Sequence, residues 1–138
     1  MGAKLFVENL ENFQNGTISA EKQDDSLSCY APMLSKKDGL IDFTKEAKEI
    51  EWAIRGLSPW PGAYTYSDGE IFKIWEADVK DGDGKEPGKV LNISKDGIEI
   101  GTGNGVLIAK VIQVPGKKRM NVSDYIKGHK IEIGKILG

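Results

Sequence analysis

The chain has 138 residues, enough for about one domain, and its apolar and charged fractions of 39% and 29% are those of an ordinary globular protein. A single cysteine, Cys29, excludes an internal disulfide framework and suits a reducing compartment, so we expect a cytoplasmic protein. We find no signal peptide, and the longest apolar-rich run, Val106 to Val114, is too short to cross a bilayer. We therefore expect no membrane partner.

Charge is distributed unevenly along the chain. Residues 1–86 carry 10 Lys and Arg against 17 Asp and Glu, a net charge of −7, whereas residues 87–138 carry 9 against 4, a net charge of +5. The two parts add up to the overall −2. A basic half can be the footprint of nucleic-acid binding, but ordinary variation gives the same pattern, and charge alone favours that simpler reading.

The first predicted element is a helix over residues 3–14, because large apolar residues recur there at helical spacing: Phe6, Leu10 and Phe13. Residues 15–40 have no sustained period and contain many turn-forming residues, so they predict a linker with a short strand near Cys29–Met33. So long an irregular stretch is more typical of a connection between two domains than of the interior of one.

A second helix is predicted from Lys45 to Arg55, with Thr44 as its N-cap and Gly56 as its C-terminal cap. Trp52 lies opposite the apolar face of this helix, which consists of Ala47, Ile50, Ile54 and Leu57. The segment Ser58-Pro59-Trp60-Pro61 follows directly. Each proline pushes the preceding residue out of the helical region, so this segment predicts a rigid corner before the first strand.

The rest of the chain predicts short strands joined by tight turns such as Asp68-Gly69 and Asp96-Gly97. This pattern favours a small barrel or sandwich. A basic loop at 115–120, a short helix at 121–127 and an extended tail at 131–137 come last. The predicted strands are Tyr64–Ser67, Glu70–Val79, Lys89–Ser94, Ile98–Thr102 and Val106–Val114.

Three patterns that suggest chemical sites lack the required context. The glycines at 101, 103 and 105 lie between two strands and do not open a helix, so a hairpin turn is favoured over a phosphate loop. Asp81 and Asp83 begin like a calcium loop, but the later ligand positions hold the wrong residues. His129 is the only histidine, so a metal cluster or a catalytic triad has little support. We predict no catalytic residue and no metal site.

Lys117, Lys118 and Arg119 follow a Pro-Gly turn, so three adjacent cations project from one loop. Such clusters bind phosphates with salt-dependent affinity, although a solvated loop is an equally common outcome. Further lysines follow closely, at 127, 130 and 135, and favour an anionic partner.

These segments together resemble the C-terminal part of methionyl-tRNA formyltransferases. The resemblance covers nearly the whole chain, and its segments occur in the order of that family. They include Tyr30-Ala31-Pro32-Met33-Leu34-Ser35-Lys36, Gly39-Leu40-Ile41-Asp42-Phe43, Ala53–Ala63, Phe72–Ala77, Gly103–Leu107, Pro115–Met120 and Asp124–His129.

The resemblance implies a mainly β fold: a small OB-like Greek-key β-barrel with an N-terminal helix, a linker, a helix before the barrel and a short C-terminal helix. It implies that residues 1–15 are the last helix of a Rossmann-like catalytic domain that this chain lacks, residues 16–40 an interdomain linker, and residues 41–138 the barrel. We therefore expect the exposed face of Phe6, Leu10 and Phe13 to dock on another copy of the chain or on the barrel.

The resemblance also implies partners and site residues. The partners are initiator methionyl-tRNA and the missing catalytic domain, with 10-formyltetrahydrofolate as co-substrate of the full-length enzyme and no cofactor in this chain. The tRNA-binding role falls on Lys117, Lys118 and Arg119, and more weakly on three other cations: Lys36, Lys37 and Arg55.

Two alternatives stay open. The same kind of barrel occurs in amino-sugar formyltransferases and in 10-formyltetrahydrofolate dehydrogenase, where it touches no RNA. A stand-alone OB-like module would instead stack nucleic-acid bases on strand aromatics such as Phe72, Trp75, Tyr64 and Tyr66.

Overall fold

A computed structural model describes residues 1–84 and 86–138. The chain forms two compact units, Met1–Pro32 and Met33–Gly138, and each is described here by itself. The boundary between the units falls inside the predicted linker. In the part of the chain that the structure describes, no helix is both long and apolar enough to span a bilayer.

The first unit holds two short helices instead of the single predicted one. α1 (Gly2–Glu8) and α2 (Leu10–Gln14) are separated at Asn9, whose side-chain amide donates a hydrogen bond of 2.9 Å to the carbonyl of Leu5. An asparagine that bonds to its own turn competes with the backbone ladder, which accounts for the break. A 3-10 turn, η1, covers Asp25–Leu27, and the strand predicted near Cys29–Met33 is wrong because those residues form no ladder.

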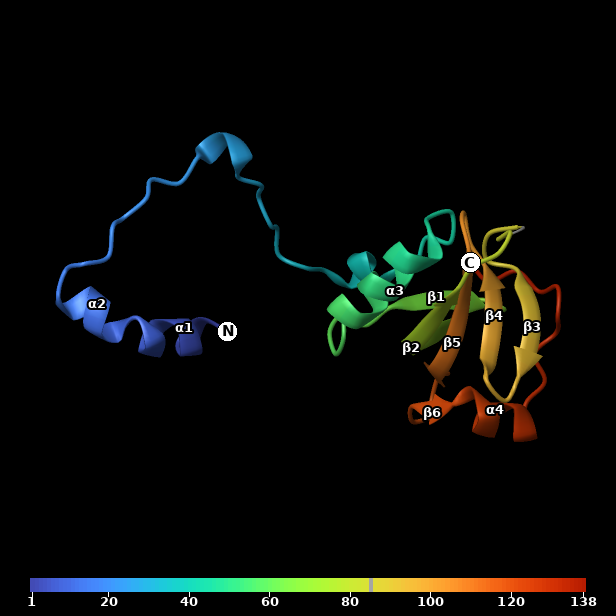
Figure 1. Cartoon of the computed structure of the whole chain (residues 1–138). Helices are drawn as coiled ribbons and strands as arrows, with labels where there is room; N and C mark the ends of the chain where they lie inside the picture. The colour runs from blue at the N-terminus through green and yellow to red at the C-terminus, as the bar shows by residue number, and fades with distance from the viewer. Residues whose placement is uncertain (85) are drawn as a thin grey trace. The chain divides into compact units, whose positions relative to one another are not determined.

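The second unit is mainly β and is built on a sheet of six antiparallel strands (Figure 1). The strand order is β1-β2-β5-β4-β3, and the short β6 pairs with β5. The predicted Asp68-Gly69 turn joins β1 to β2, with both residues at positive φ. The bounds are β1 Tyr64–Ser67, β2 Glu70–Lys80, β3 Val90–Ser94, β4 Gly97–Gly101, β5 Val106–Gln113 and β6 Met120–Asn121.

The sheet is not closed into a complete barrel, since its edge strands β1 and β3 are not paired with each other in the described chain. The C-terminal tail lies along the β3 edge instead. Gly134 donates to the Val90 carbonyl at 2.7 Å, and the Leu137 amide donates to Gly88 at 2.9 Å. The amide of Gly138 then donates to Tyr66 of β1 at 3.0 Å, so the tail connects both edges of the open sheet.

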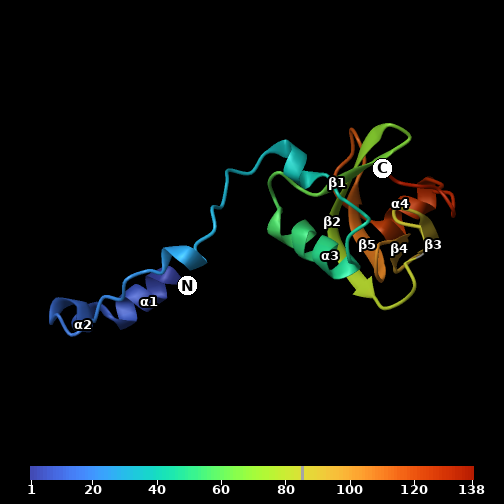
Figure 2. The ribbon, with the colours of Figure 1, turned by 90° about the horizontal axis from the view of Figure 1, so that it is seen from above.

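Two helices pack on the sheet (Figures 1 and 2): α3 (Ala47–Gly56) contacts β2 and β5, and α4 (Val122–Gly128) contacts β4, β5 and β6. The predicted caps of α3 are wrong. Its N-cap is Glu46, because the Thr44 hydroxyl donates to the Asp42 carboxylate at 2.6 Å instead of capping the helix. Gly56 is the last helical residue, and Leu57 is the C-cap.

The core lies between the sheet and the helices. It combines both helices, the strands and the tail through fully or nearly fully buried residues: Ile50, Ile54, Phe72, Ile74, Ile98, Ile100, Leu107, Ile112, Val122 and Leu137. The apolar face predicted for α3 is thus confirmed at its buried positions, Ala47, Ile50 and Ile54.

The Pro-Trp-Pro corner leads from α3 into β1, and both of its X-Pro peptide bonds are cis. Gly62 ends the corner at φ +77, and a Cβ there would lie 2.9 Å from the ring of Trp75. A Cβ on Gly39 would lie 2.4 Å from the Gly62 carbonyl. Glycine is therefore required at both positions, and the corner is packed between residue 39 and Trp75.

The glycine-rich segment at 101–105 joins β4 to β5, as predicted for a hairpin turn. Gly103 donates to the carbonyls of Phe43 and Lys45, both at 2.9 Å, and a Cβ on it would lie 1.8 Å from the Thr44 carbonyl. This turn therefore fixes the segment that leads into α3.

Candidate nucleic-acid interface

The basic loop, predicted at 115–120, covers residues 114–119 in the structure, where it connects β5 to β6. It is anchored on both sides, since Val111 pairs with Asn121 and Ile112 with Met120. Within it the Lys117 amide donates to the Val114 carbonyl at 3.2 Å, and Gly116 adopts φ +71. Lys117, Lys118 and Arg119 are all exposed, as their predicted role requires.

Two successive hydrogen bonds connect the loop to Trp75, the first part-buried and the second exposed. The indole Nε1 of Trp75 donates to Gln113 Oε1 at 3.0 Å, and Gln113 Nε2 donates to the Lys117 carbonyl at 2.9 Å. Trp75 is only 8% exposed because it occupies a bulge in β2, where the register with β5 shifts between Ile74 and Glu76. The bulge thus allows two successive side chains, Ile74 and Trp75, to be buried.

Arg119 lies over the face of the same tryptophan, with its Cζ 3.3 Å from the ring centroid of Trp75. Lys73 Nζ also lies 5.4 Å from that centroid. A guanidinium that stacks on a ring keeps its N–H donors in its own plane, where they stay available for a phosphate. The aromatic ring therefore orients Arg119 without using its hydrogen-bonding capacity.

Ion pairing separates the cations of residues 87–138 into two groups. Four of the nine form salt bridges: Lys89 with Glu86, Lys110 with Asp78, Lys127 with Asp124, and Lys135 with Asp68. Within the described residues, the other five form none: Lys95, Lys117, Lys118, Arg119 and Lys130. The basic loop therefore concentrates three of the five cations whose charge no carboxylate offsets.

The weaker sequence candidates lie in different surroundings. Arg55 donates to both carboxylate oxygens of Glu51, at 2.5 and 3.2 Å, and this hydrogen bonding raises the pKa of Arg55 above its ordinary value. Its charge is thus partly offset. Lys36 and Lys37 are exposed on the 3-10 helix η2 (Lys36–Gly39), beside Asp38, which caps that helix through Ser35. In the described structure no hydrogen bond or ion pair joins these three cations to the basic loop.

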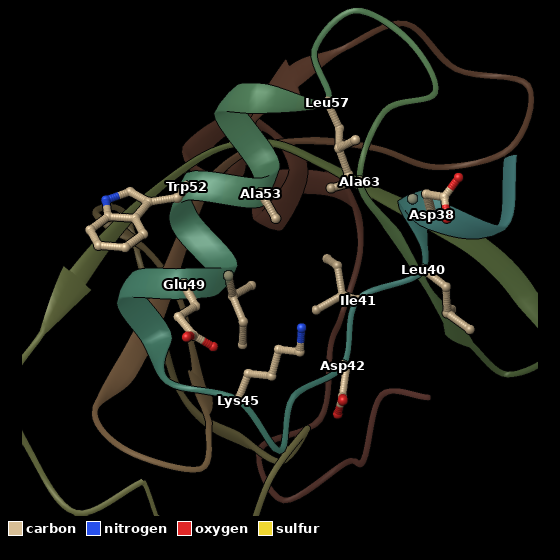
Figure 3. Close-up of a pocket in the computed structure, with 12 residues that line it drawn as sticks. Asp38, Leu40, Ile41, Asp42, Lys45, Glu49, Trp52, Ala53, Leu57 and Ala63 are labelled. Atoms are coloured by element: carbon tan, nitrogen blue, oxygen red, sulfur yellow. The ribbon is translucent and has the colours of Figure 1, made fainter. Parts of the chain in front are cut away.

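A pocket of about 330 Å³ lies between α3 and the segment 38–42 (Figure 3). Ile41 and Ala53 contribute apolar surface to it, Asp38, Asp42 and Glu49 line it with carboxylates, and Lys45 is the one cation among the described lining residues. The hydroxyl and the amide of Thr44 hold the pKa of Asp42 below its ordinary value, so this carboxylate stays ionised. An acidic lining repels a phosphate backbone, so this pocket is not the nucleic-acid site.

The aromatic residues Trp52, Phe72 and Trp75 differ in their exposure to solvent. Trp52 also lines this pocket (Figure 3), but it is 52% exposed and has Lys48 Nζ 5.4 Å from its ring. Phe72 and Trp75 are buried in the domain and cannot serve as stacking platforms for bases. The described residues also contain no cluster of His, Cys, Asp and Glu suited to a metal ion.

Sequence reasoning found the basic loop but missed Trp75 and Gln113 as its supports. The two residues are 38 positions apart in the chain, and only the β2–β5 register brings them together. Aligning the two predicted strands Glu70–Val79 and Val106–Val114 as an antiparallel pair, with the bulge included, would have placed Trp75 near Gln113.

Comparison with known proteins matches residues 33–130 to the formyl transferase C-terminal domain. Among curated relatives, a methionyl-tRNA formyltransferase from Citrifermentans bemidjiense is 42% identical over 138 residues, which is 100% of this chain and 43% of that protein. One from Clostridium novyi is 46% identical over 137 residues, 99% of this chain and 44% of that protein. The chain therefore spans less than half the length of these relatives.

Solved structures show the same fold at low sequence identity. HypX from Aquifex aeolicus, crystallised in complex with tetrahydrofolic acid, aligns with a TM-score of 0.60 and 20% identity over 91% of this chain and 22% of HypX. A variant of HypX aligns with a TM-score of 0.61 and 19% identity over 94% of this chain and 24% of that one.

Proposed function

This chain belongs to the formyl transferase C-terminal domain family, and we propose that it is the tRNA-binding C-terminal region of a methionyl-tRNA formyltransferase. The full enzyme transfers a formyl group from 10-formyltetrahydrofolate to the α-amino group of methionine on initiator tRNA. The curated relatives at 42–46% identity carry that name, which supports this choice within the family.

The chemistry of the transfer belongs to the part of the enzyme that this chain does not span. The amine attacks the formyl carbon as a neutral nucleophile, so a general base must hold or accept its proton. We assign neither that base nor a folate-binding residue to this chain. Its contribution is to bind and orient the tRNA, which converts a loose encounter into a positioned complex.

The observation that carries the proposal is the exposed basic loop. Lys117, Lys118 and Arg119 are exposed, adjacent and free of salt bridges within the described structure, whereas four other lysines of residues 87–138 are paired. Such a cluster suits the continuous phosphate backbone of an RNA better than a small neutral ligand. The loop is therefore the proposed contact, with Lys36, Lys37 and Arg55 as secondary contacts.

A direct binding comparison tests this proposal. The 138-residue chain is titrated at low salt into fluorescently labelled initiator tRNA and, separately, into a sugar nucleotide, the substrate class of amino-sugar formyltransferases. We expect binding of tRNA only. Saturable binding of the sugar nucleotide, without tRNA binding, would instead support the amino-sugar alternative.

A further inference from the structure

The basic loop has a support that links it to the interior of the domain. Trp75 is held at the β2 bulge, and its ring abuts Gly62 at the end of the Pro-Trp-Pro corner. From this fixed position the ring stacks on Arg119 and its indole N–H bonds to Gln113. Gln113 in turn bonds to the carbonyl of Lys117. Trp75 is therefore linked to the loop at two points, directly at Arg119 and through Gln113 at Lys117.

We propose that Trp75 and Gln113 are positioning residues that hold the basic loop in its phosphate-binding arrangement before the tRNA arrives. This inference rests on the proposed function and adds the mechanism by which the loop acts. An unsupported loop of this kind loses conformational freedom when it binds, and that entropy weakens the affinity. Trp75 and Gln113 restrict the loop before binding, so less conformational entropy is lost when the tRNA binds.

The geometry separates this role from a direct contact with the ligand. Trp75 is 8% exposed and Gln113 is half-buried, and both polar ends of Gln113 are already bonded within the protein. Neither residue carries a charge, so their loss leaves the number of cations unchanged. Their removal should therefore weaken binding at every salt concentration without changing the slope of log K against log [salt], which counts neutralised phosphates.

Arg119 offers a second variant that keeps the charge. A lysine in its place has the same charge but lacks the planar guanidinium that stacks on Trp75. We expect Arg119→Lys to behave like the loss of the support, with lower affinity at an unchanged salt slope. Lys118→Ala removes a cation that makes no ion pair in the described structure, so it should instead reduce the slope.

The experiment compares Lys118→Ala and four other variants of the 138-residue chain with the unaltered chain. Gln113→Met removes both hydrogen bonds at similar volume, Trp75→Phe removes the indole donor, and Arg119→Lys removes the stack. Asn92→Met is the matched control, because Asn92 is an exposed amide on β3 with no side-chain hydrogen bond in the described residues. Circular dichroism confirms folding, NMR order parameters report the loop, and anisotropy with labelled initiator tRNA gives affinity and slope.

We expect the order parameters of residues 116–119 to fall in Gln113→Met and Trp75→Phe from values near 0.85 toward 0.6. Affinity should fall about threefold to tenfold in all three support variants at an unchanged slope, and Asn92→Met should change neither quantity. A loop that stays ordered, or a loosened loop that binds tRNA as well as before, would overturn the proposal. Failure of the unaltered chain to bind tRNA would contradict the proposed function itself, and this proposal with it.

Discussion

Leu137 should be the residue through which the C-terminal tail stabilises the open sheet. It is 5% exposed and belongs to the main core, whereas the adjacent Ile136 is 64% exposed on the same tail. Replacing a buried leucine with alanine costs about 2.7–5 kcal/mol, and a tail without regular structure can partly collapse into the space. We therefore expect Leu137→Ala to lower the free energy of unfolding by about 2–3 kcal/mol.

For a domain of this size each kcal/mol shifts the melting temperature by about 5 °C, so Leu137→Ala should melt about 10–15 °C lower. Ile136→Ala is the matched control, since it removes an exposed side chain of the same size and should cost less than about 0.5 kcal/mol. Urea unfolding followed by circular dichroism, together with thermal melts, measures both. Equal effects of the two variants would refute the view that Leu137 anchors the tail across the gap between β1 and β3.

Three further predictions concern single positions. The Thr65 hydroxyl is fully buried and has no hydrogen-bond partner in the described residues. Thr65→Val should therefore raise the free energy of unfolding by about 1 kcal/mol in urea unfolding. A lower free energy of unfolding would show that the hydroxyl forms a hydrogen bond in the folded protein. Gly103→Ala would place a Cβ against the Thr44 carbonyl, so it should lower the free energy of unfolding by more than about 2 kcal/mol in the same assay. In Gly116→Ala the new Cβ meets no atom and only the positive φ is strained, so the loss of stability should be smaller. Equal losses in the two variants would contradict the packing argument. Because the pKa of Asp42 is lowered below 3.8 by the Thr44 hydroxyl and amide, its ionised form adds stability that is present above that value and lost as pH falls through the folded pKa. The stability difference between the unaltered chain and Asp42→Asn should therefore shrink on acidification below about pH 4, and a difference that stays constant down to pH 2 would contradict the assignment.

Local patterns in the sequence predicted the elements that local physics decides. The Asp68-Gly69 turn was identifiable because few residue pairs adopt two successive positive φ angles, and the periodicity of Ile50 and Ile54 correctly located α3. The prediction that Thr44 caps α3 was wrong for a local reason as well. The carboxylate of Asp42, two residues away, accepts the hydrogen bond of the Thr44 hydroxyl instead.

Features that depend on distant parts of the chain were not predictable. The tail was expected to be extended, but nothing in its sequence showed that it would connect β3 to β1 or that Leu137 would be its buried residue. The mainly β fold was expected, but the opening of its sheet between β1 and β3 depends on the same distant contacts. The support of the basic loop by Trp75 and Gln113 requires a bulge and a strand register that a single sequence does not specify.

The salt dependence of tRNA binding tests the central claim most directly. Affinity of the 138-residue chain for labelled initiator tRNA is measured between about 50 and 200 mM salt, beside a variant with alanine at positions 117, 118 and 119. Each phosphate contact contributes about −0.7 to −0.9 to the slope of log K against log [salt], so we expect the triple variant to be flatter by about 2 to 3. Identical slopes, or binding by the unaltered chain that ignores salt, would contradict the assignment of the basic loop as the tRNA contact.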